Sequence, residues 1–215
     1  MGNLFVWDFH GVLEKDNEYA VQEVVNRVLL EFNINKKSTV EECRAMYGRK
    51  WADYFKFYAP NANEDTIHKM VVKATEISIG ERIATKYIKP TEHAHDVLKQ
   101  IADKGHTNLI MSNSSDISLN YFLEAVNMQN AFHHKFGADI HRKDKYSKDT
   151  KSEFLKEFLK DKSFDKIILI DDMEQAIEMG LRFNAITFRF HRNSVKPKSK
   201  AHYVIDDLRE VLNFI

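Results

Sequence analysis

Two apolar runs that lie far apart in the chain each end in carboxylates, and this feature constrains the fold more than any other. Phe5–Trp7 leads into Asp8, and the run KIILI at Lys166–Ile170 leads into Asp171 and Asp172. Short apolar runs of this kind predict buried strands. A carboxylate at the end of a buried strand is unfavourable unless it binds a cation or takes part in chemistry. The two runs therefore predict a divalent-metal site at the tips of two core strands.

The rest of the chain alternates between strand and helix patterns. Apolar runs predict strands at Asn3–Phe9, Thr107–Asn113, Lys135–Asp139, Lys166–Asp171, Ala185–Phe190 and Tyr203–Ile205. Helical periodicity predicts helices between them and at the end of the chain, at Ala94–Lys104, Leu119–Asn127, Lys151–Leu159, Met173–Leu181 and Asp207–Phe214. This alternation predicts an α/β fold with a doubly wound, Rossmann-like parallel sheet whose ligands bind at the carboxyl ends of the strands. Asp8, Ser112 and Asp171 all fall at such ends.

Residues 15–90 interrupt this alternation. The segments Asn17–Phe32, Thr39–Tyr58 and Glu64–Tyr87 are helical in period, with no credible strand among them. We therefore expect an all-helical insert between the first two core strands, with hinges near Glu14–Asn17 and Ile88–Thr91. The core would then consist of residues 1–14 and 91–215.

Composition excludes several classes of protein. Among 215 residues, 32 Lys and Arg balance 32 Asp and Glu, so no overall field favours nucleic acid or a membrane as partner. The single cysteine, Cys43, excludes an intramolecular disulfide and is typical of a reducing compartment. The start MGNLFVWDF lacks the basic segment of a signal peptide, and no run reaches the ~18 apolar residues of a membrane-spanning helix. We expect a cytoplasmic monomer or homodimer.

Four short motifs follow one another along the chain. Asp8 opens DFHGVL, the run LIMSN contains Ser112, Lys148 or Lys151 lies near the start of a helix, and Asp171-Asp172 ends a strand. In this order they resemble the motifs of the haloacid dehalogenase superfamily, over essentially the whole chain. The helical insert lies where the phosphoglycolate phosphatases and β-phosphoglucomutases of that superfamily carry a helical cap. The resemblance implies a catalytic core with residues 15–90 as its cap.

The resemblance implies that Asp8 is a nucleophile that attacks phosphorus and forms an aspartyl phosphate. It also implies a Mg²⁺ ion bound by Asp8, Asp171, Asp172 and the backbone carbonyl of His10, since this hard cation prefers oxygen ligands. On the residues alone, Asp8 is also compatible with a turn-capping role.

His10 departs from the family motif, which has a second acid at this position. In the family that acid protonates the leaving oxygen and then deprotonates the attacking water. A histidine is able to do both, because its ordinary pKa of about 6.5 makes both forms available near neutrality. Two alternatives remain: a weak or inactive enzyme, and different chemistry, as in the family's dehalogenases and phosphonate hydrolases, which also lack an acid here.

The resemblance assigns the phosphoryl group to Ser112, Asn113 and a lysine. The lysine is placed at Lys148, with Lys151, in the first turn of a predicted helix, as the alternative. Either would anchor Asp8 and offset phosphate charge. A serine at the end of a strand is also a common turn or cap residue.

Substrate recognition is expected from the cap. Arg49 and Lys50 lie in the stretch YGRKW, where they are candidates for binding substrate over the active site. The alternative is a helix with buried Trp51 and solvated cations. Ala176 occupies a position where the family often has another acid or asparagine, and Glu174 is the candidate to compensate for it.

The function expected from these motifs is Mg²⁺-dependent hydrolysis of a small phosphorylated metabolite. The alternatives are a phosphomutase of the same fold and a catalytically weak or inactive binding protein. A dehalogenase fits less well, because it needs no metal and would not require Asp171 and Asp172.

Overall fold

The computed structural model describes residues 2–138, 150–192 and 195–215. A sheet of six parallel strands forms its centre, in the spatial order β5-β4-β1-β6-β7-β8. These strands are β1 (Leu4–Trp7), β4 (Thr107–Ser112), β5 (His134–Gly137), β6 (Ile167–Asp171), β7 (Ile186–Phe190) and β8 (Tyr203–Ile205). The predicted doubly wound parallel sheet is therefore confirmed, with strand ends within one or two residues of most predicted ones.

Strand β1 lies between β4 and β6, and its register brings the predicted site together. Val6 is paired with Leu109 on one side and Leu169 on the other, and Trp7 is paired with Ile110 and Ile170. The Asp8 N–H continues this ladder by donating to the Ile170 carbonyl oxygen at 2.9 Å. Because the strands are parallel, the residues that follow them emerge at the same edge of the sheet.

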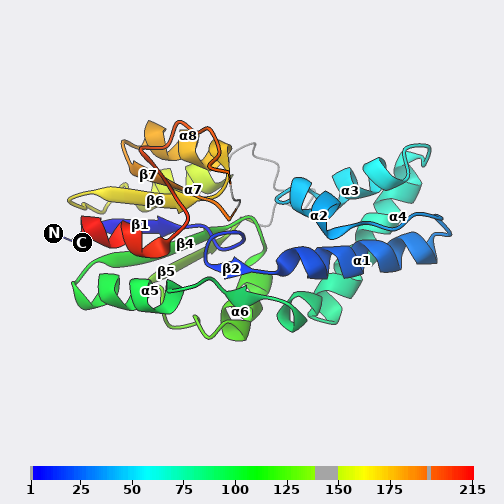
Figure 1. The fold of residues 1–215 in the computed structure, drawn as a ribbon, viewed down its shortest axis with the longest axis horizontal. Coiled ribbons are helices and arrows are strands. Elements are labelled where there is room, and N and C mark those ends of the chain that lie inside the picture. Colours follow the sequence, from blue (N-terminus) through cyan, green and yellow to red (C-terminus); the bar gives the residue numbers. More distant parts are fainter. Residues whose placement is uncertain (1, 139–149, 193–194) are drawn as a thin grey trace.

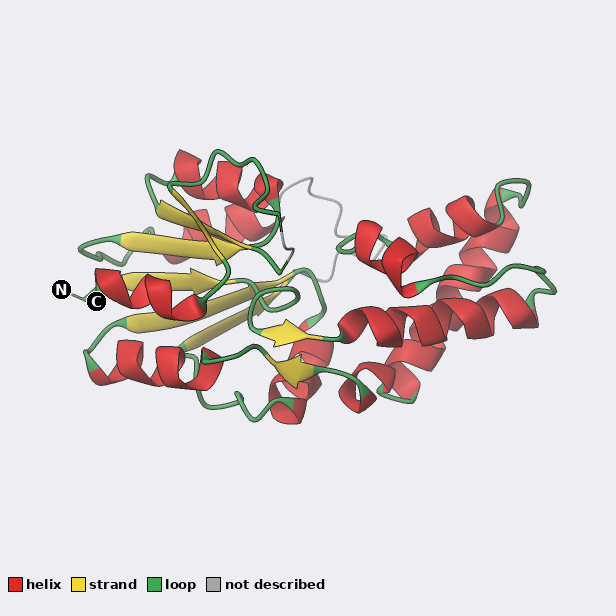
Figure 2. Ribbon diagram, in the orientation of Figure 1, coloured by secondary structure: helices red, strands yellow, loops and turns green. Residues whose placement is uncertain are grey.

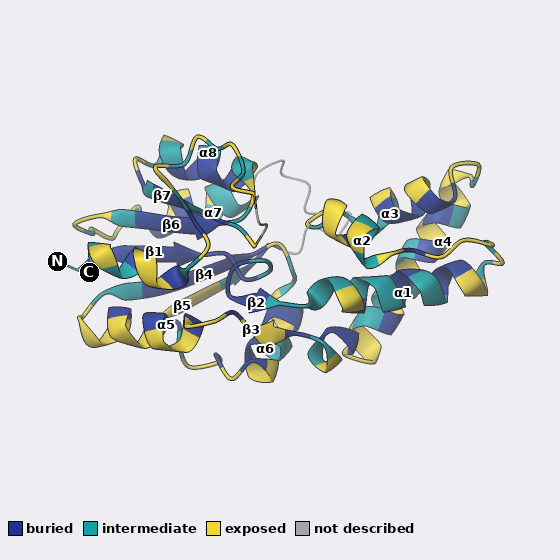
Figure 3. Ribbon diagram, in the orientation of Figure 1, coloured by how far each residue is buried: buried dark blue, intermediate teal, exposed yellow. Residues whose placement is uncertain are grey.

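Helices cover both faces of the sheet (Figures 1 and 2). Alternate residues of β1 point to opposite faces, so Phe5 and Trp7 join one buried cluster while Leu4 and Val6 join another. The first cluster includes side chains of α5 (Ala94–Asp103), α6 (Asp116–Ala125) and a 3₁₀ helix at Leu208–Phe214. The second includes α7 (Thr150–Phe158) and α8 (Glu174–Arg182). Figure 3 shows the resulting pattern, with buried strands and helices exposed on their outer sides.

Residues 16–88, between β1 and α5, form the helical insert, which extends to one side of the sheet (Figure 1). Its helices are α1 (Asn17–Glu31), α2 (Val40–Ala45), α3 (Trp51–Tyr58) and α4 (Glu64–Thr75), followed by a π-helical turn at Glu76–Gly80 and a 3₁₀ helix at Ile83–Lys86. The insert is joined to the sheet by two short antiparallel strands, β2 (Glu14–Lys15) and β3 (Lys89–Pro90).

The helical insert differs from the prediction in three ways. The helix predicted at Thr39–Tyr58 is two helices, because Gly48 adopts a left-handed conformation with φ +76° between them. The segment Glu64–Tyr87 is not one α-helix, since Arg82, at φ +49°, separates the π-helical turn from the 3₁₀ helix. Residues 15–90 were expected to contain no strand, but β2 and β3 pair at the two ends of this segment. None of the helices that the structure describes is both long and apolar enough to cross a membrane.

Candidate active site

Three carboxylates from two strands meet at the carboxyl edge of the sheet. Asp8 directly follows β1, Asp171 is the last residue of β6, and Asp172 comes next. One carboxylate oxygen of each lies within 4.8 Å of the corresponding oxygens of the other two. Asp8 is only 9% exposed and Asp171 only 3%. The structure thus brings together the three acids that the sequence predicted to converge.

The electrostatics of this cluster favour a bound cation. Burial, which is partly offset by the charge of Lys151 and reinforced by that of Asp171, raises the pKa of Asp8 to about 6. Burial, followed by the charges of Asp171 and Asp8, raises the pKa of Asp172 well above its usual value. Crowded carboxylates of this kind resist ionisation unless positive charge is added. The donors are all oxygens, so the residues fit a hard divalent cation such as Mg²⁺.

Lys151 supplies positive charge from the first turn of α7. Its Nζ atom lies 2.6 Å from Asp8 Oδ1 and 3.2 Å from Asp171 Oδ2. Burial by itself lowers the pKa of this ammonium, but Asp171 and Asp8 outweigh that effect and the pKa is raised. Lys151 is thus held in its charged form. Lys148, the lysine that the motif order favoured, lies outside the described residues.

His10 lies beside Asp8, and both of its ring nitrogens have partners. Nδ1 is 2.8 Å from Glu14 Oε1, and Nε2 is 3.2 Å from Ser114 Oγ. The ring contacts Phe122 edge-on, with 4.9 Å between the ring centroids. A histidine therefore occupies the position where the motif has an acid, and one of its nitrogens faces the serine-rich loop after β4.

Two further residues of the site were not assigned a role from sequence. Glu14 is completely buried, and Tyr47 donates its hydroxyl hydrogen to Glu14 Oε1 at 2.9 Å. The sequence did contain a sign of the role of Glu14. This carboxylate directly follows the apolar residues Val12 and Leu13, within residues 1–14 that were predicted to belong to the core domain.

Ser112 and Asn113 lie at the end of β4 and line the same cleft as Asp8. Ser112 is 1% exposed, and its Oγ accepts a hydrogen bond from the backbone N–H of Ser114 at 3.2 Å. Asn113 is exposed. The carboxyl edge of the sheet therefore presents carboxylates, an ammonium and a hydroxyl to one cavity.

This cavity has a volume of about 760 Å³ and extends from the carboxylates to the helical insert. On the side of the insert, the cavity is lined by Arg49 and Lys50, which precede α3, and by Trp51, the first residue of α3. Asp8 lines the same cavity. Much of its remaining wall is apolar, and includes Val21, Val24, Ile83 and Phe122. The structure thus places both predicted cap cations on the same cleft as the acidic cluster.

Glu174 does not occupy the position expected for it. Its carboxylate lies 2.9 Å from the Arg189 guanidinium and accepts hydrogen bonds from Ser199 Oγ at 2.7 Å and from the Lys200 N–H at 2.8 Å. With both oxygens engaged there, Glu174 does not replace the ligand missing at Ala176, and that expectation is wrong.

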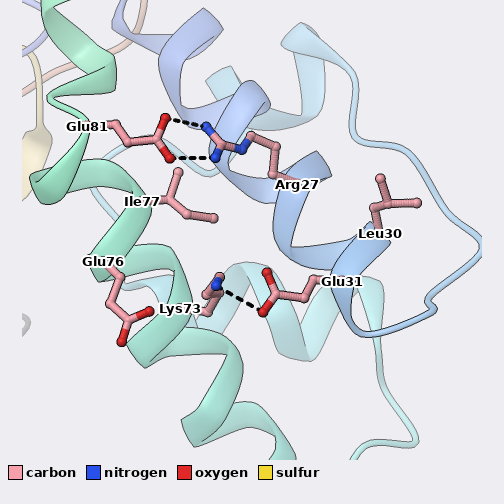
Figure 4. Close-up of a pocket in the computed structure, with 7 residues that line it drawn as sticks. All are labelled: Arg27, Leu30, Glu31, Lys73, Glu76, Ile77 and Glu81. Carbon is pink, nitrogen blue, oxygen red and sulfur yellow. Dashed lines mark hydrogen bonds and ion pairs between the residues drawn. The ribbon is translucent and has the colours of Figure 1, made fainter.

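A second, smaller cavity lies in the helical insert between α1 and the segment from α4 to Glu81 (Figure 4). The two cations that line it are paired with carboxylates: Arg27 with Glu81, and Lys73 with Glu31 at 3.0 Å. Both ion pairs are exposed to solvent, and we assign the cavity no ligand.

The fold and the acidic cluster define an α/β protein with a carboxylate-lined cleft at the carboxyl ends of its central strands. Residues 5–190 match the model of the haloacid dehalogenase-like hydrolase family. The chain belongs to this family, so the resemblance inferred from four motifs is confirmed, and so is the expectation of a hydrolase.

Known relatives extend over nearly the whole chain. The phosphoserine phosphatase of Methanocaldococcus jannaschii is 28% identical over 226 residues, which cover 99% of this chain and 97% of that protein. A haloacid dehalogenase-like family hydrolase from Streptococcus pneumoniae has a similar structure, with a TM-score of 0.78, 12% identity and coverage of 99% and 98%. The structure of CbbY from Rhodobacter sphaeroides in complex with phosphate gives a TM-score of 0.71, with 13% identity and coverage of 98% and 96%. At these identities the two structures establish similarity of fold.

Proposed function

We propose that this protein is a Mg²⁺-dependent phosphatase that hydrolyses a small phosphorylated metabolite through an aspartyl phosphate on Asp8. One observation carries the proposal: the Asp8 carboxylate borders the cleft, bound by Lys151 at 2.6 Å, with Asp171 and Asp172 beside it. Similarity to a phosphatase over the whole chain supports the same reaction class.

In the first step, a carboxylate oxygen of Asp8 attacks the phosphorus atom of the substrate. The new bond joins Asp8 to phosphorus while the bond from phosphorus to the ester oxygen breaks. His10 gives a proton to the departing oxygen, so that an alcohol leaves. In the second step, His10 takes a proton from water as the water attacks the aspartyl phosphate, which releases inorganic phosphate and restores Asp8.

Asp8, Asp171, Asp172 and the His10 carbonyl would hold Mg²⁺. When bound, the metal neutralises the charge shared by the phosphoryl group and its nucleophile. Lys151 contributes positive charge to the same place, and its contacts with Asp8 support it, rather than Lys148, as the lysine of the site.

Ser112 and Asn113 are the proposed hydrogen-bond donors to phosphoryl oxygens. We further propose that residues 15–90 act as a cap on a core made of residues 1–14 and 91–215. Arg49 and Lys50, which line the cleft from the insert, would then bind the part of the substrate that is not transferred. The cytoplasmic location and the monomeric or dimeric state remain predictions.

A phosphate-release assay tests the proposal. The purified protein is given a panel of phosphomonoesters without an added acceptor, with Mg²⁺ or with a chelator, and inorganic phosphate is measured. We expect the protein to release phosphate only with Mg²⁺, and we expect Asp8→Asn to abolish this release. Release without an added acceptor would distinguish a phosphatase from a phosphomutase. Asp207→Asn is the matched control, since Asp207 caps the C-terminal 3₁₀ helix. Unchanged turnover in Asp8→Asn would refute the proposal.

A further inference from the structure

Glu14 is a buried carboxylate that the proposed reaction does not use. It lies in β2 with no exposed surface, and its Oε1 atom is shared by three partners: His10 Nδ1 at 2.8 Å, Tyr47 Oη at 2.9 Å and Gly11 N–H at 3.3 Å. Its Oε2 atom is buried without a hydrogen-bond partner. A buried carboxylate oxygen without a hydrogen-bond partner is unfavourable for stability, so its retention here calls for an explanation.

The contact with Glu14 determines which nitrogen of His10 is presented to the cleft. Glu14 Oε1 already accepts hydrogen bonds from the Tyr47 hydroxyl and the Gly11 N–H, so we assign it as the acceptor for His10 as well, with the hydrogen on Nδ1. The amide nitrogen of Asn17 lies farther from Nδ1, at 3.4 Å. In the neutral ring, Nε2 then carries the lone pair, and this nitrogen lies 3.2 Å from Ser114 Oγ. The ring is also confined by edge-on contacts with Phe122 and Phe9, at 4.9 and 5.1 Å between centroids.

Tyr47 brings the helical insert into this arrangement. It lies between α2 and α3, whereas Glu14 and His10 belong to the segment that follows β1. Burial, followed by the charge of Glu14, raises the pKa of the Tyr47 hydroxyl well above its usual value. Tyr47 therefore stays protonated and donates to Glu14, so the carboxylate is bound from the core and from the insert together.

We propose that Glu14 and Tyr47 are positioning residues that hold His10 with Nε2 toward the substrate's leaving oxygen, and that Tyr47 makes this orientation depend on the seated helical insert. The inference rests on the proposed function, in which His10 transfers the proton. It assigns Glu14 and Tyr47 no direct contact with the phosphoryl group.

The first test compares Glu14→Gln and Tyr47→Phe on two probes, glycerol 2-phosphate and p-nitrophenyl phosphate. The alkoxide of glycerol needs protonation as it leaves, whereas p-nitrophenolate does not. We expect Glu14→Gln to lower kcat/KM for glycerol 2-phosphate about 10²-fold and Tyr47→Phe about 10-fold, with much smaller losses on p-nitrophenyl phosphate. Equal losses on both probes would indicate general damage to the site and would overturn the inference.

The chain offers a matched control pair. Tyr58 donates to Glu42 Oε2 at 2.9 Å within the insert, so Tyr58→Phe and Glu42→Gln remove the same groups away from the cleft. A double-mutant comparison adds a second criterion: once His10→Asn has removed the ring, Glu14→Gln should cause no further loss on glycerol 2-phosphate. Additive losses would contradict an action through His10.

A spectroscopic measurement tests the orientation independently of turnover. In alkaline buffer, the imidazole ¹⁵N shifts of His10 should show hydrogen on Nδ1 in the wild type and lose this preference in Glu14→Gln. Hydrogen on Nε2 in the wild type would overturn the inference. If the wild type releases phosphate and both positioning variants retain its kcat/KM, the inference fails while the proposed function stands. If the wild type releases no phosphate from any phosphomonoester, the proposed function fails and the inference fails with it.

Discussion

The ammonium of Lys151 lies 2.6 Å from a carboxylate oxygen of Asp8, although 143 positions separate the two residues in the chain. Both side chains are nearly buried, and Asp171 accepts from the same ammonium at 3.2 Å. One cation therefore faces two carboxylates of the acidic cluster, and Asp172 adds a third. This imbalance of charge makes the behaviour of the site depend strongly on pH, on metal and on Lys151 itself.

Replacing Lys151 by methionine should impair both activity and stability. The variant leaves buried carboxylates without their cation, which typically costs about 3–5 kcal/mol in the absence of compensation. We expect a larger drop in the unfolding free energy with chelator than with Mg²⁺, and at least a ~10²-fold lower kcat with Mg²⁺. Urea unfolding and phosphate release measure these effects. Lys156→Met, at an exposed position of the same helix, is the control. Equal stability of the two variants would contradict this role of Lys151.

The raised pKa of Asp8 predicts how stability changes with pH. Its pKa is about 6 in the folded protein and 3.8 for an unperturbed aspartate, so the folded state binds more protons between these pH values. The unfolding free energy of the metal-free protein should therefore decrease as pH rises from about 4 to about 6, by roughly 3 kcal/mol at most. Mg²⁺ should raise the unfolding free energy, and by more at pH 7 than at pH 5, because it binds the ionised carboxylates.

Asp8→Asn isolates this contribution, because asparagine does not ionise. In chelator, the variant should be more stable than the wild type at pH 7, and the difference should disappear near pH 4. Urea unfolding at both pH values gives the comparison. A stability difference that does not change with pH would show that Asp8 is not the group responsible.

Arg49 is expected to affect substrate binding more than the chemical step. It belongs to the helical insert and lines the cleft that also contains the acidic cluster. Loss of binding energy that is equal in ground state and transition state raises KM and leaves kcat unchanged. Arg49→Ala should therefore raise KM about 10-fold, with kcat within about 3-fold of wild type. Arg44→Ala is the control, since Arg44 pairs with Glu18 at 2.8 Å and is not among the lining residues. A fall in kcat with unchanged KM would contradict a binding role.

The acidic cluster was predictable from sequence, whereas the surroundings of His10 were not. Parallel strands in register bring the residues after them to one edge, so recognising two strands was enough to place Asp8 near Asp171. The contact between Glu14 and Tyr47 depends instead on how the insert folds back. A continuous helix over Thr39–Tyr58 would have carried Tyr47 in its middle, and the break at Gly48 was not anticipated.

Comparing Gly11 with Gly105 separates a steric requirement of the site from backbone strain alone. Its φ is +82°, and a Cβ there would lie 2.5 Å from Asp172 Oδ2. Gly105 has nearly the same φ, +80°, but a Cβ there would meet nothing within 4 Å. Both Gly→Ala variants should lose roughly 1–2 kcal/mol of stability from left-handed strain. Only Gly11→Ala should also displace Asp172, and so weaken Mn²⁺ or Mg²⁺ binding by at least 10-fold in titration calorimetry. Equal metal affinity in the two variants would mean that Asp172 is not a ligand whose position matters.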